Sequence, residues 1–323
     1  MEARQPTSKC LICGVNDSTQ KNSHIVPACL IKSMIGKRYK EHSFVIDTKT
    51  ARYKEYYGRD RLDNPSTEIK EHTHARDFYF CPGCEHYLGK LEGKICPSIT
   101  DELRDPKKSG NYLLKNLDEV TYKELLKISS DDFNVFFLSI IYRQALQRKI
   151  DDGISVLSDV DFETIRVIIS SYLSDDKVTY KRFCDQFGLM IFTANSVDKD
   201  NSNMTTHLNW KRPYAFIVNE FLVLVYSATD ISQGKNQPDL YSYMLTIISN
   251  PIYPKRVPNI FFLPDVMWSK ILGKILNEYV TKPIVRRLKK IRIAFNVAKQ
   301  VKKDNKKKNK VLRNSRRASK RKK

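Results

Sequence analysis

Two pairs of closely spaced cysteines are the feature that most constrains how this chain can fold. Cys10 and Cys13 form one pair, and Cys81 and Cys84 form the other. With two residues between its members, each pair can present two thiolates from one tight turn, and four thiolates at about 2.3 Å make a closed tetrahedral ligand set for Zn²⁺. The alternative, buried free cysteines, does not explain the paired spacing. The sequence therefore predicts a structural zinc ion held by both pairs.

The other three cysteines have no partner at metal-ligand spacing. Cys29, Cys96 and Cys184 are solitary, and we expect them to be small core residues. The chain has seven cysteines in all. An odd count with two metal-type pairs is typical of a reducing compartment and indicates metal binding rather than disulfides.

Hydropathy predicts a protein that does not span a membrane. No stretch of the sequence approaches the roughly 20 consecutive apolar residues that cross a bilayer, and residues 1–9 lack the apolar run of a secretory signal. With 323 residues, of which 41% are apolar, the chain is long enough to form two compact units. We expect a cytoplasmic protein with no transmembrane segment.

Positive charge is concentrated at the C-terminal end of the chain. Residues 282–323 hold 20 of the 57 basic residues and one of the 36 acidic residues, so the rest carries 37 and 35 and is nearly neutral. Apolar residues three and four apart between 284 and 298 predict a basic amphipathic helix, and 302–323 is expected to be disordered. The densest cations are Lys306, Lys307, Lys308, Arg316, Arg317, Lys320 and Arg321.

This tail is expected to bind nucleic acid, DNA in the first instance, through contacts with the phosphate backbone. Such contacts release counterions, so binding weakens steeply as the salt concentration rises and carries little sequence preference. Phe295 is the single aromatic residue of the tail, which gives little basis for base stacking. The alternatives are a solvated tail and a helix that lies on an anionic membrane.

The first hundred residues have the pattern of short strands and one helix. We expect strands at 44–47 and 78–80, a linker at 104–110, and a helix that begins at the last cysteine of the second pair. Leu88, Leu91 and Ile95 would form its core stripe, and Glu85, Gly89 and Glu92 share another face. Gly89 is expected to let a neighbouring strand approach closely.

Periodicity predicts a mixed domain over residues 111–281. Residues 111–180 have a helical pattern, with one helix over 133–150, capped by Asp131 and Asp132, and another over 159–173. Later segments are rich in β-branched and aromatic residues, with a tight turn at Asn219 and Glu220. Strands are expected at 189–193, 214–218, 221–227 and 241–248, a polar loop at 198–203, and a last helix over 265–279.

The residues around the cysteine pairs resemble a known family. A Ser-His-Ile-Val-Pro segment runs from Ser23 to Pro27, and Glu85 and His86 follow the second pair at once. This arrangement is similar to the HNH, or ββα-metal, nucleases, and is closest to poorly characterised bacterial HNH-like proteins with a Ser-His-Ile-Val-Pro strand and a Cys-x-x-Cys-Glu helix. Residues 137–143 also resemble a helix of that group.

The resemblance implies a catalytic site. In such nucleases a strand histidine activates water and a divalent cation, Mg²⁺ or Mn²⁺, stabilises the scissile phosphate. On this chain the base would be His24, and Glu85 or His86 would help to hold the cation. Asn64 is the candidate for the family's central asparagine. Ser23 stands where the family commonly has an acidic metal ligand, and His72 or His74 could supply a ligand in its place.

We therefore expect an α+β protein in three parts. Residues 1–104 would form a zinc-stapled, treble-clef-like ββα-metal module. Residues 111–281 would form a mixed helical and antiparallel β domain of unassigned role, and 282–323 a basic helical and disordered tail. Two functions follow from this interpretation: a metal-dependent nuclease, or a non-catalytic zinc protein that binds nucleic acid or a protein partner, for example as a regulatory subunit in bacterial defence.

Overall fold

The computed structural model of the 323-residue chain describes residues 4–30, 42–47, 52–57, 75–103, 105–117, 120–195, 204–207, 213–227 and 258–277, together with Leu240, Met244 and Ile247. Of these, the residues within 1–43 and 55–270 belong to one compact unit, and those within 44–54 and 271–277 belong to another. Both cysteine pairs, the long helices and the large sheet lie in the first unit. The division at residues 104–111 stays a prediction.

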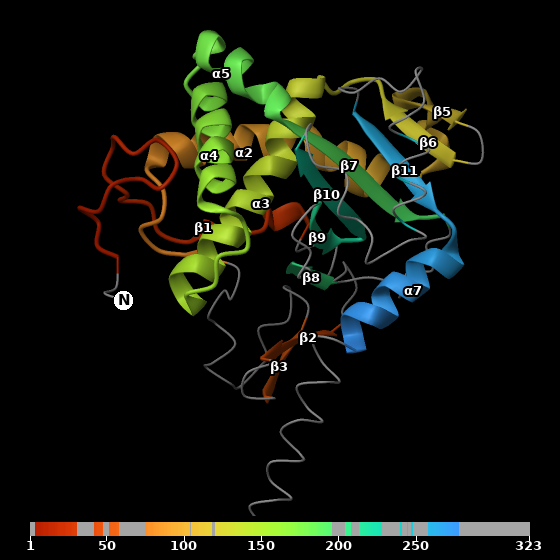
Figure 1. The fold of residues 1–323 in the computed structure, drawn as a ribbon, viewed down its shortest axis with the longest axis horizontal. Coiled ribbons are helices and arrows are strands. Elements are labelled where there is room, and N and C mark those ends of the chain that lie inside the picture. Colours follow the sequence, from red (N-terminus) through yellow and green to blue (C-terminus); the bar gives the residue numbers. More distant parts are fainter. Residues whose placement is uncertain are drawn as a thin grey trace, which may run out of the picture. The chain divides into compact units, whose positions relative to one another are not determined.

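Seven of the described strands form one mixed sheet (Figure 1). In spatial order they are β5 (Tyr112–Leu117), β6 (Val120–Leu125), β11 (Asn259–Leu263), β7 (Phe187–Ala194), β10 (Phe221–Ser227), β9 (Tyr214–Asn219) and β8 (Met204–His207). Neighbouring strands are antiparallel except β11 and β7, which run parallel with Ile260 opposite Ile191. The sheet is mixed because a long crossover separates these two strands in sequence, so the wholly antiparallel sheet that we predicted is wrong at this pair.

The strands predicted at 189–193, 214–218 and 221–227 are confirmed. β9 and β10 form a hairpin in which Val218 lies opposite Phe221, so the turn at Asn219 and Glu220 is confirmed as well. Every β10 side chain from Phe221 to Tyr226 is buried. A continuous apolar run of this kind is typical of a strand that is covered on both faces.

Helix α3 (Ser130–Asp152) is surrounded by other elements and forms the centre of the unit. Its Phe137 ring lies 6.2 Å from Phe221 of β10, and its Tyr142 ring lies 4.7 Å from Phe162 of α4 (Asp159–Leu173). Almost all side chains from 132 to 146 are therefore buried. The helices predicted at 133–150 and 159–173 are confirmed. The α3 cap is Ser129, however, with Asp131 and Asp132 in the first turn.

The first turn of α3 ties three helices together through one buried carboxylate. Asp132 is 6% exposed and accepts hydrogen bonds from the Ser129 hydroxyl (2.6 Å), from Lys94 of α2 (Pro82–Cys96) and from Tyr172 of α4. Burial alone would raise the pKa of Asp132, but these three hydrogen bonds together lower it below its usual value. The charged form is thus the stable form in the folded protein.

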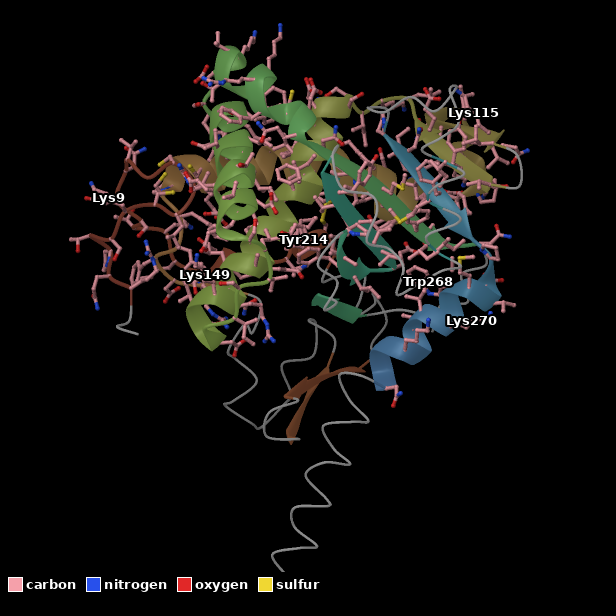
Figure 2. The ribbon with its side chains drawn as sticks, viewed as in Figure 1. Lys9, Lys115, Lys149, Tyr214, Trp268 and Lys270 are labelled. Carbon is pink, nitrogen blue, oxygen red and sulfur yellow. A yellow bond between two sulfur atoms is a disulfide. The ribbon has the colours of Figure 1, made fainter. Side chains whose placement is uncertain are left out.

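A buried tyrosine joins α4 to the sheet. Tyr214 of β9, labelled in Figure 2, donates to Oδ2 of Asp161 (2.6 Å) and accepts from the Ser158 backbone N–H (3.1 Å), at the start of α4. The short helix α5 (Lys177–Phe183) and the 3₁₀ turn η4 (Cys184–Gln186) then lead into β7. Cys184 is buried and free, as predicted.

Two small sheets complete the described strands. β1 (Ser23–His24) pairs antiparallel with β4 (Ala75–Arg76), with Ser23 opposite Arg76. β2 (His42–Asp47) pairs with β3 (Arg52–Tyr57), which confirms the strand predicted at 44–47. Helix α7 (Asp265–Leu276) confirms the last predicted helix. The expected loop at 198–203 and the tail, 282–323, lie outside the described residues.

The clearest error of the sequence-based predictions concerns residues 112–125, which have a helical pattern but form the hairpin β5–β6. Leucine, lysine and glutamate are good helix formers, but the free energy of this preference is small for each residue. The pairing of β6 with β11 therefore overrides it. Leu113 and Leu114 of β5 are 46% and 64% exposed, so they do not form a core stripe.

Two shorter predictions are also wrong, and a segment expected as a linker contains a short helix. Residues 78–80 form a turn and bend in which Phe78 has φ +60°, and the rings of Tyr79 and Phe80 are buried in the core without strand pairing. Most of the segment expected as a linker at 104–110 forms the 3₁₀ helix η3 (Pro106–Asn111), which follows the π-helical turn η2 (Pro97–Glu102), and its role as a linker stays a prediction. In the strand expected at 241–248, Met244 and Ile247 are helical and buried, which fits a period of 3.6 rather than 2.

Candidate metal centre and adjoining polar cluster

The first cysteine pair lies in a tight loop before β1. The Cys10 N–H donates to Asn16 O (2.8 Å), and the Gly14 N–H donates to Cys10 O (2.9 Å). Gly14 has φ +70°, a backbone conformation that residues with a Cβ rarely adopt. The loop therefore folds back on itself and presents both thiols on one side.

The second pair lies at the N-terminus of α2. Cys81 is the N-cap, and its sulfur accepts a hydrogen bond from the Cys84 N–H at 3.5 Å. Pro82 occupies the first turn, where its missing N–H leaves no bond unmade. The helix thus begins at Pro82, two residues before the predicted start. Leu88, Leu91 and Ile95 are all buried, so the predicted core stripe is confirmed.

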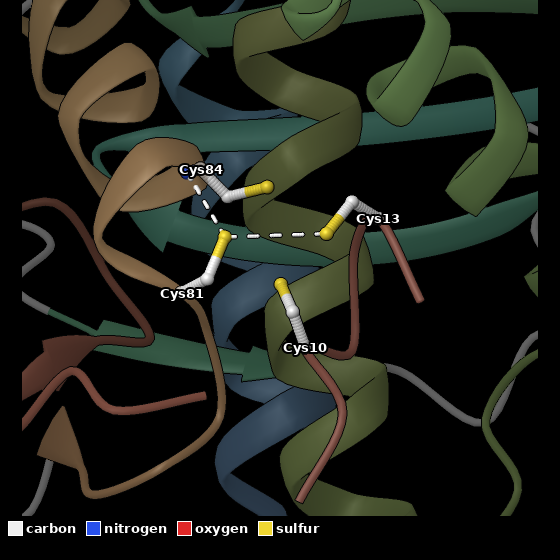
Figure 3. Close-up of side chains that lie close together, drawn as sticks. All are labelled: Cys10, Cys13, Cys81 and Cys84. Atoms are coloured by element: carbon white, nitrogen blue, oxygen red, sulfur yellow. Dashed lines mark hydrogen bonds between the residues drawn. The ribbon is translucent and has the colours of Figure 1, made fainter. Parts of the chain in front are cut away.

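The four sulfurs converge on one point (Figure 3). All lie within 4.8 Å of one another, and Cys13 Sγ is 3.9 Å from Cys81 Sγ. A tetrahedral zinc site with bonds of about 2.3 Å requires sulfurs about 3.8 Å apart. Cys10, Cys81 and Cys84 are buried, and Cys13 is partly buried. The four cysteines can therefore hold a zinc ion, as their spacing predicted.

The electrostatics of the thiols favour a bound cation. A hydrogen bond with the Cys84 thiol lowers the pKa of Cys10 to about 4, and the same bond, together with burial, raises the pKa of Cys84. Burial also raises the pKa of Cys81. Four adjacent thiols cannot all ionise without a positive charge among them, which is the charge that a zinc ion would supply.

Contacts from the central helices fix the position of the first cysteine loop. Tyr142 of α3 donates to the carbonyl of Leu11, and Arg166 of α4 donates to the carbonyl of Ile12 (2.6 Å). Asn16 Nδ2 lies 3.9 Å from Cys81 Sγ. These neighbours orient the thiols and add positive charge near them, as the surroundings of structural metal sites do.

A second group of polar residues lies where β1 meets α2 and α3. This Glu85 cluster comprises Ser23 and His24 of β1, Glu85 and Glu92 of α2, and Arg143 of α3. Arg143 is 1% exposed, and its Nη1 donates to the His24 carbonyl and to Glu92 Oε1, both at 2.8 Å. The structure therefore brings His24 and Glu85, both predicted as site residues, to the same place.

Glu85 is a partly buried residue whose Oε2 atom is buried and leaves a hydrogen bond unmade. Burial raises its pKa, while nearby Arg143 and the adjacent Ser23 hydroxyl and His24 backbone act to lower it. These neighbours favour the charged form electrostatically. Glu85 Oε2 and Ser23 Oγ are both buried. Although the two groups lie close enough to interact, neither atom makes a hydrogen bond of good geometry with a described residue. Orphaned buried oxygens of this kind call for a ligand, a cation or an ordered water.

The other predicted site residues lie elsewhere or outside the described part. His86 is exposed, and its ring lies 5.7 Å from the Tyr87 ring, so it faces away from the buried cluster. Gly89 is exposed, and a Cβ added to it would meet nothing within 4 Å, so the close strand approach predicted there is wrong. Asn64, His72, His74 and the tail cations lie outside the described residues.

Two features were missed at the sequence level. Arg143 is a charged residue within an apolar helical segment, and that interruption was the available signal. Cys29 and Cys96 are joined by a disulfide, with Cα atoms 6.3 Å apart. Their prediction as separate core residues is therefore wrong, and so is the expectation that the cysteines form no disulfide. They are 67 residues apart, and no spacing rule connects them.

No family model, curated protein or solved structure matches this chain. Among the helices in the described ranges, none combines the length and apolar content that a bilayer span requires.

Proposed function

We propose that this chain is an HNH-like, metal-dependent nuclease that hydrolyses phosphodiester bonds in nucleic acid, with His24 as the general base. The observation that carries the proposal is the buried Oε2 atom of the partly buried Glu85, which has no hydrogen bond of good geometry and lies beside the backbone of the strand that bears His24. This carboxyl lies one residue after a thiol of the candidate zinc centre.

The order of the surrounding elements supports a treble-clef-like ββα-metal module. The first cysteine pair is followed by β1, by the separate pair β2 and β3, by β4, which is the antiparallel partner of β1, and by α2 with the second pair at its start. In this proposal the zinc ion is structural, because four thiolate ligands leave no position open for substrate. Its role is to hold β1 against the first turn of α2.

The Glu85 cluster fits a second, hard divalent cation. Glu85 Oε2 and Ser23 Oγ are oxygen ligands of the kind that Mg²⁺ and Mn²⁺ prefer, and both are without a partner among the described residues. A bound Mg²⁺ or Mn²⁺ would stabilise charge on the scissile phosphate and on the leaving oxygen. The part of His24 is to take a proton from the attacking water. His86 has no part in the site, since it is exposed.

We propose DNA as the first substrate to test, bound through its phosphate backbone by the basic tail. The body of the chain is nearly neutral, so the tail supplies most of the attraction for a polyanion. Contacts of this kind bind the phosphate backbone of the DNA without recognising its base sequence. The position of cleavage would then be determined by the proposed site and not by the tail.

One observation favours a non-catalytic zinc protein instead. Among the described residues of the cluster, Glu92 is engaged by Arg143, which leaves Glu85 as the one carboxylate available to a cation. Ser23 is a weak ligand in place of a second carboxylate. In this second function the module keeps its zinc and the protein binds nucleic acid or a partner protein, as a regulatory subunit of a defence system would, without cleaving.

A comparison of two histidine variants separates these functions. Zinc-loaded protein is incubated with supercoiled plasmid and Mg²⁺ or Mn²⁺, alongside His24→Ala and the matched control His86→Ala. The nuclease proposal expects cleavage by the wild type and His86→Ala, and its loss in His24→Ala. Plasmid binding without cleavage under all metal conditions supports the non-catalytic function. Equal cleavage by all three proteins refutes the role of His24.

A further inference from the structure

We infer that Arg143 is the positioning residue of the Glu85 cluster: it holds β1 and α2 together, so that the backbone of His24 lies beside the Glu85 carboxyl. The inference rests on the proposed function, since it assigns a role within that site. Arg143 acts through the His24 backbone and Glu92 and is not itself a catalytic residue.

The contacts of the guanidinium join three elements. Nη1 donates to the His24 carbonyl of β1 and to Glu92 Oε1 of α2, both at 2.8 Å. Nε donates to the Ser139 carbonyl of α3, and Nη2 lies 3.2 Å from the Ser139 hydroxyl. The side chain is therefore clamped within its own helix while it holds the other two elements.

The pairing with Glu92 determines what remains for Glu85. Both carboxylates lie on one face of α2, seven residues apart, and both are close enough to Arg143 to feel its charge. The directional contacts of Arg143 go to Glu92, whereas Glu85 Oε2 remains without a partner among the described residues. The Glu92 carboxylate thus neutralises the buried Arg143 guanidinium, and the Glu85 carboxylate is left available for a ligand.

Stability alone does not account for this arginine. A buried ion pair contributes little net stability, because the cost of removing both charges from water offsets their attraction, and apolar residues of similar size often replace it without loss. The neighbouring α3 positions, such as Ile140 and Leu146, are apolar and buried. An arginine guanidinium, in contrast, is planar and carries several N–H donors, so it can bind a carbonyl and a carboxylate at fixed angles at the same time.

The test removes the ion pair as a whole. Arg143→Met alone leaves Glu92 without its partner and is expected to be strongly destabilised, so the informative protein is the double variant Arg143→Met with Glu92→Met. It is expected to bind zinc and to melt near the wild-type temperature, because both charges are removed together. If Arg143 positions the site, kcat for plasmid cleavage falls about 100-fold while KM stays within about twofold.

A spectroscopic readout keeps the test independent of catalysis. Protein labelled with ¹³C at histidine carbonyls gives one signal for each of six histidines, and the His24 signal is the one absent from His24→Ala. We expect this signal to shift in the double variant, because its carbonyl loses the guanidinium donor.

The outcomes separate the inference from the proposed function. A folded double variant with wild-type kcat overturns the positioning role while the nuclease function stands. If the wild type does not cleave, the nuclease function fails, and the carbonyl signal alone decides the inference. An unshifted His24 signal overturns it, and a shifted signal supports Arg143 as the residue that fixes β1.

Discussion

Replacing one thiol of the candidate zinc centre should cost far more stability than replacing a free cysteine. We consider Cys13→Ser, since Cys13 is the least buried of the four and its replacement disturbs packing least. The centre joins residues 68 apart in sequence, and closing a loop of that length is worth about 4 kcal/mol of unfolded-chain entropy. The Cys29–Cys96 disulfide shortens the effective loop, but the dependence is logarithmic and alters this figure by less than about 1 kcal/mol.

The assay combines zinc analysis with equilibrium urea unfolding followed by circular dichroism. The matched control is Cys184→Ser, which changes a buried free thiol outside the cluster and is expected to cost about 1 kcal/mol with zinc retained. Cys13→Ser should lose the zinc and be destabilised by about 3 kcal/mol more than the control, which lowers the melting temperature by roughly a further 10 °C. Full zinc occupancy in Cys13→Ser, or equal unfolding free energies for both variants, would show that the four thiols do not share one ion.

Three further predictions concern other parts of the chain. Asp132→Asn should have a lower free energy of unfolding than wild type at pH 7. Because folding lowers the pKa of Asp132, this difference in unfolding free energy should shrink as the pH falls below about 4. A difference that stays constant with pH would contradict this prediction. Gly89→Leu and Gly93→Leu should each stabilise α2 by under about 1 kcal/mol. Only Gly89→Leu places a side chain over the helical turn that contains Glu85, so only this variant should cleave DNA more slowly. Equal cleavage by the two variants would count against the proposed site. Removal of residues 282–323 should weaken duplex DNA binding and lower its salt slope by about 0.9 for each phosphate that the tail neutralises, and unchanged affinity at low salt would show that the tail does not bind.

Features of the fold that depend on strong local patterns could be predicted from the sequence. The spacing within each cysteine pair is a local feature, and the convergence of the two pairs was predictable because four thiolates complete the ligand set of one zinc ion. Helices α3 and α4 followed from long apolar periods, and β9 and β10 from apolar runs on either side of a turn.

The remaining features depend on contacts between distant segments. The β5–β6 hairpin has helix-forming residues and is a pair of strands because β6 adds to β11. The disulfide joins two cysteines that no spacing rule connects. Within the candidate site, His24 and Glu85 were predicted through a family resemblance, whereas the role of Arg143 became visible only once α3 was placed against β1 and α2.

The most direct test of the proposed site is the binding of Mn²⁺ to zinc-loaded protein, measured by electron paramagnetic resonance. We predict one Mn²⁺ per chain at the free oxygen of Glu85, with affinity reduced at least about tenfold in Glu85→Gln. Affinity should be unchanged in Glu102→Gln, whose carboxylate already accepts a hydrogen bond from Asn111 at 2.7 Å. No bound Mn²⁺, or equal binding by wild type and Glu85→Gln, would contradict the proposed cation site.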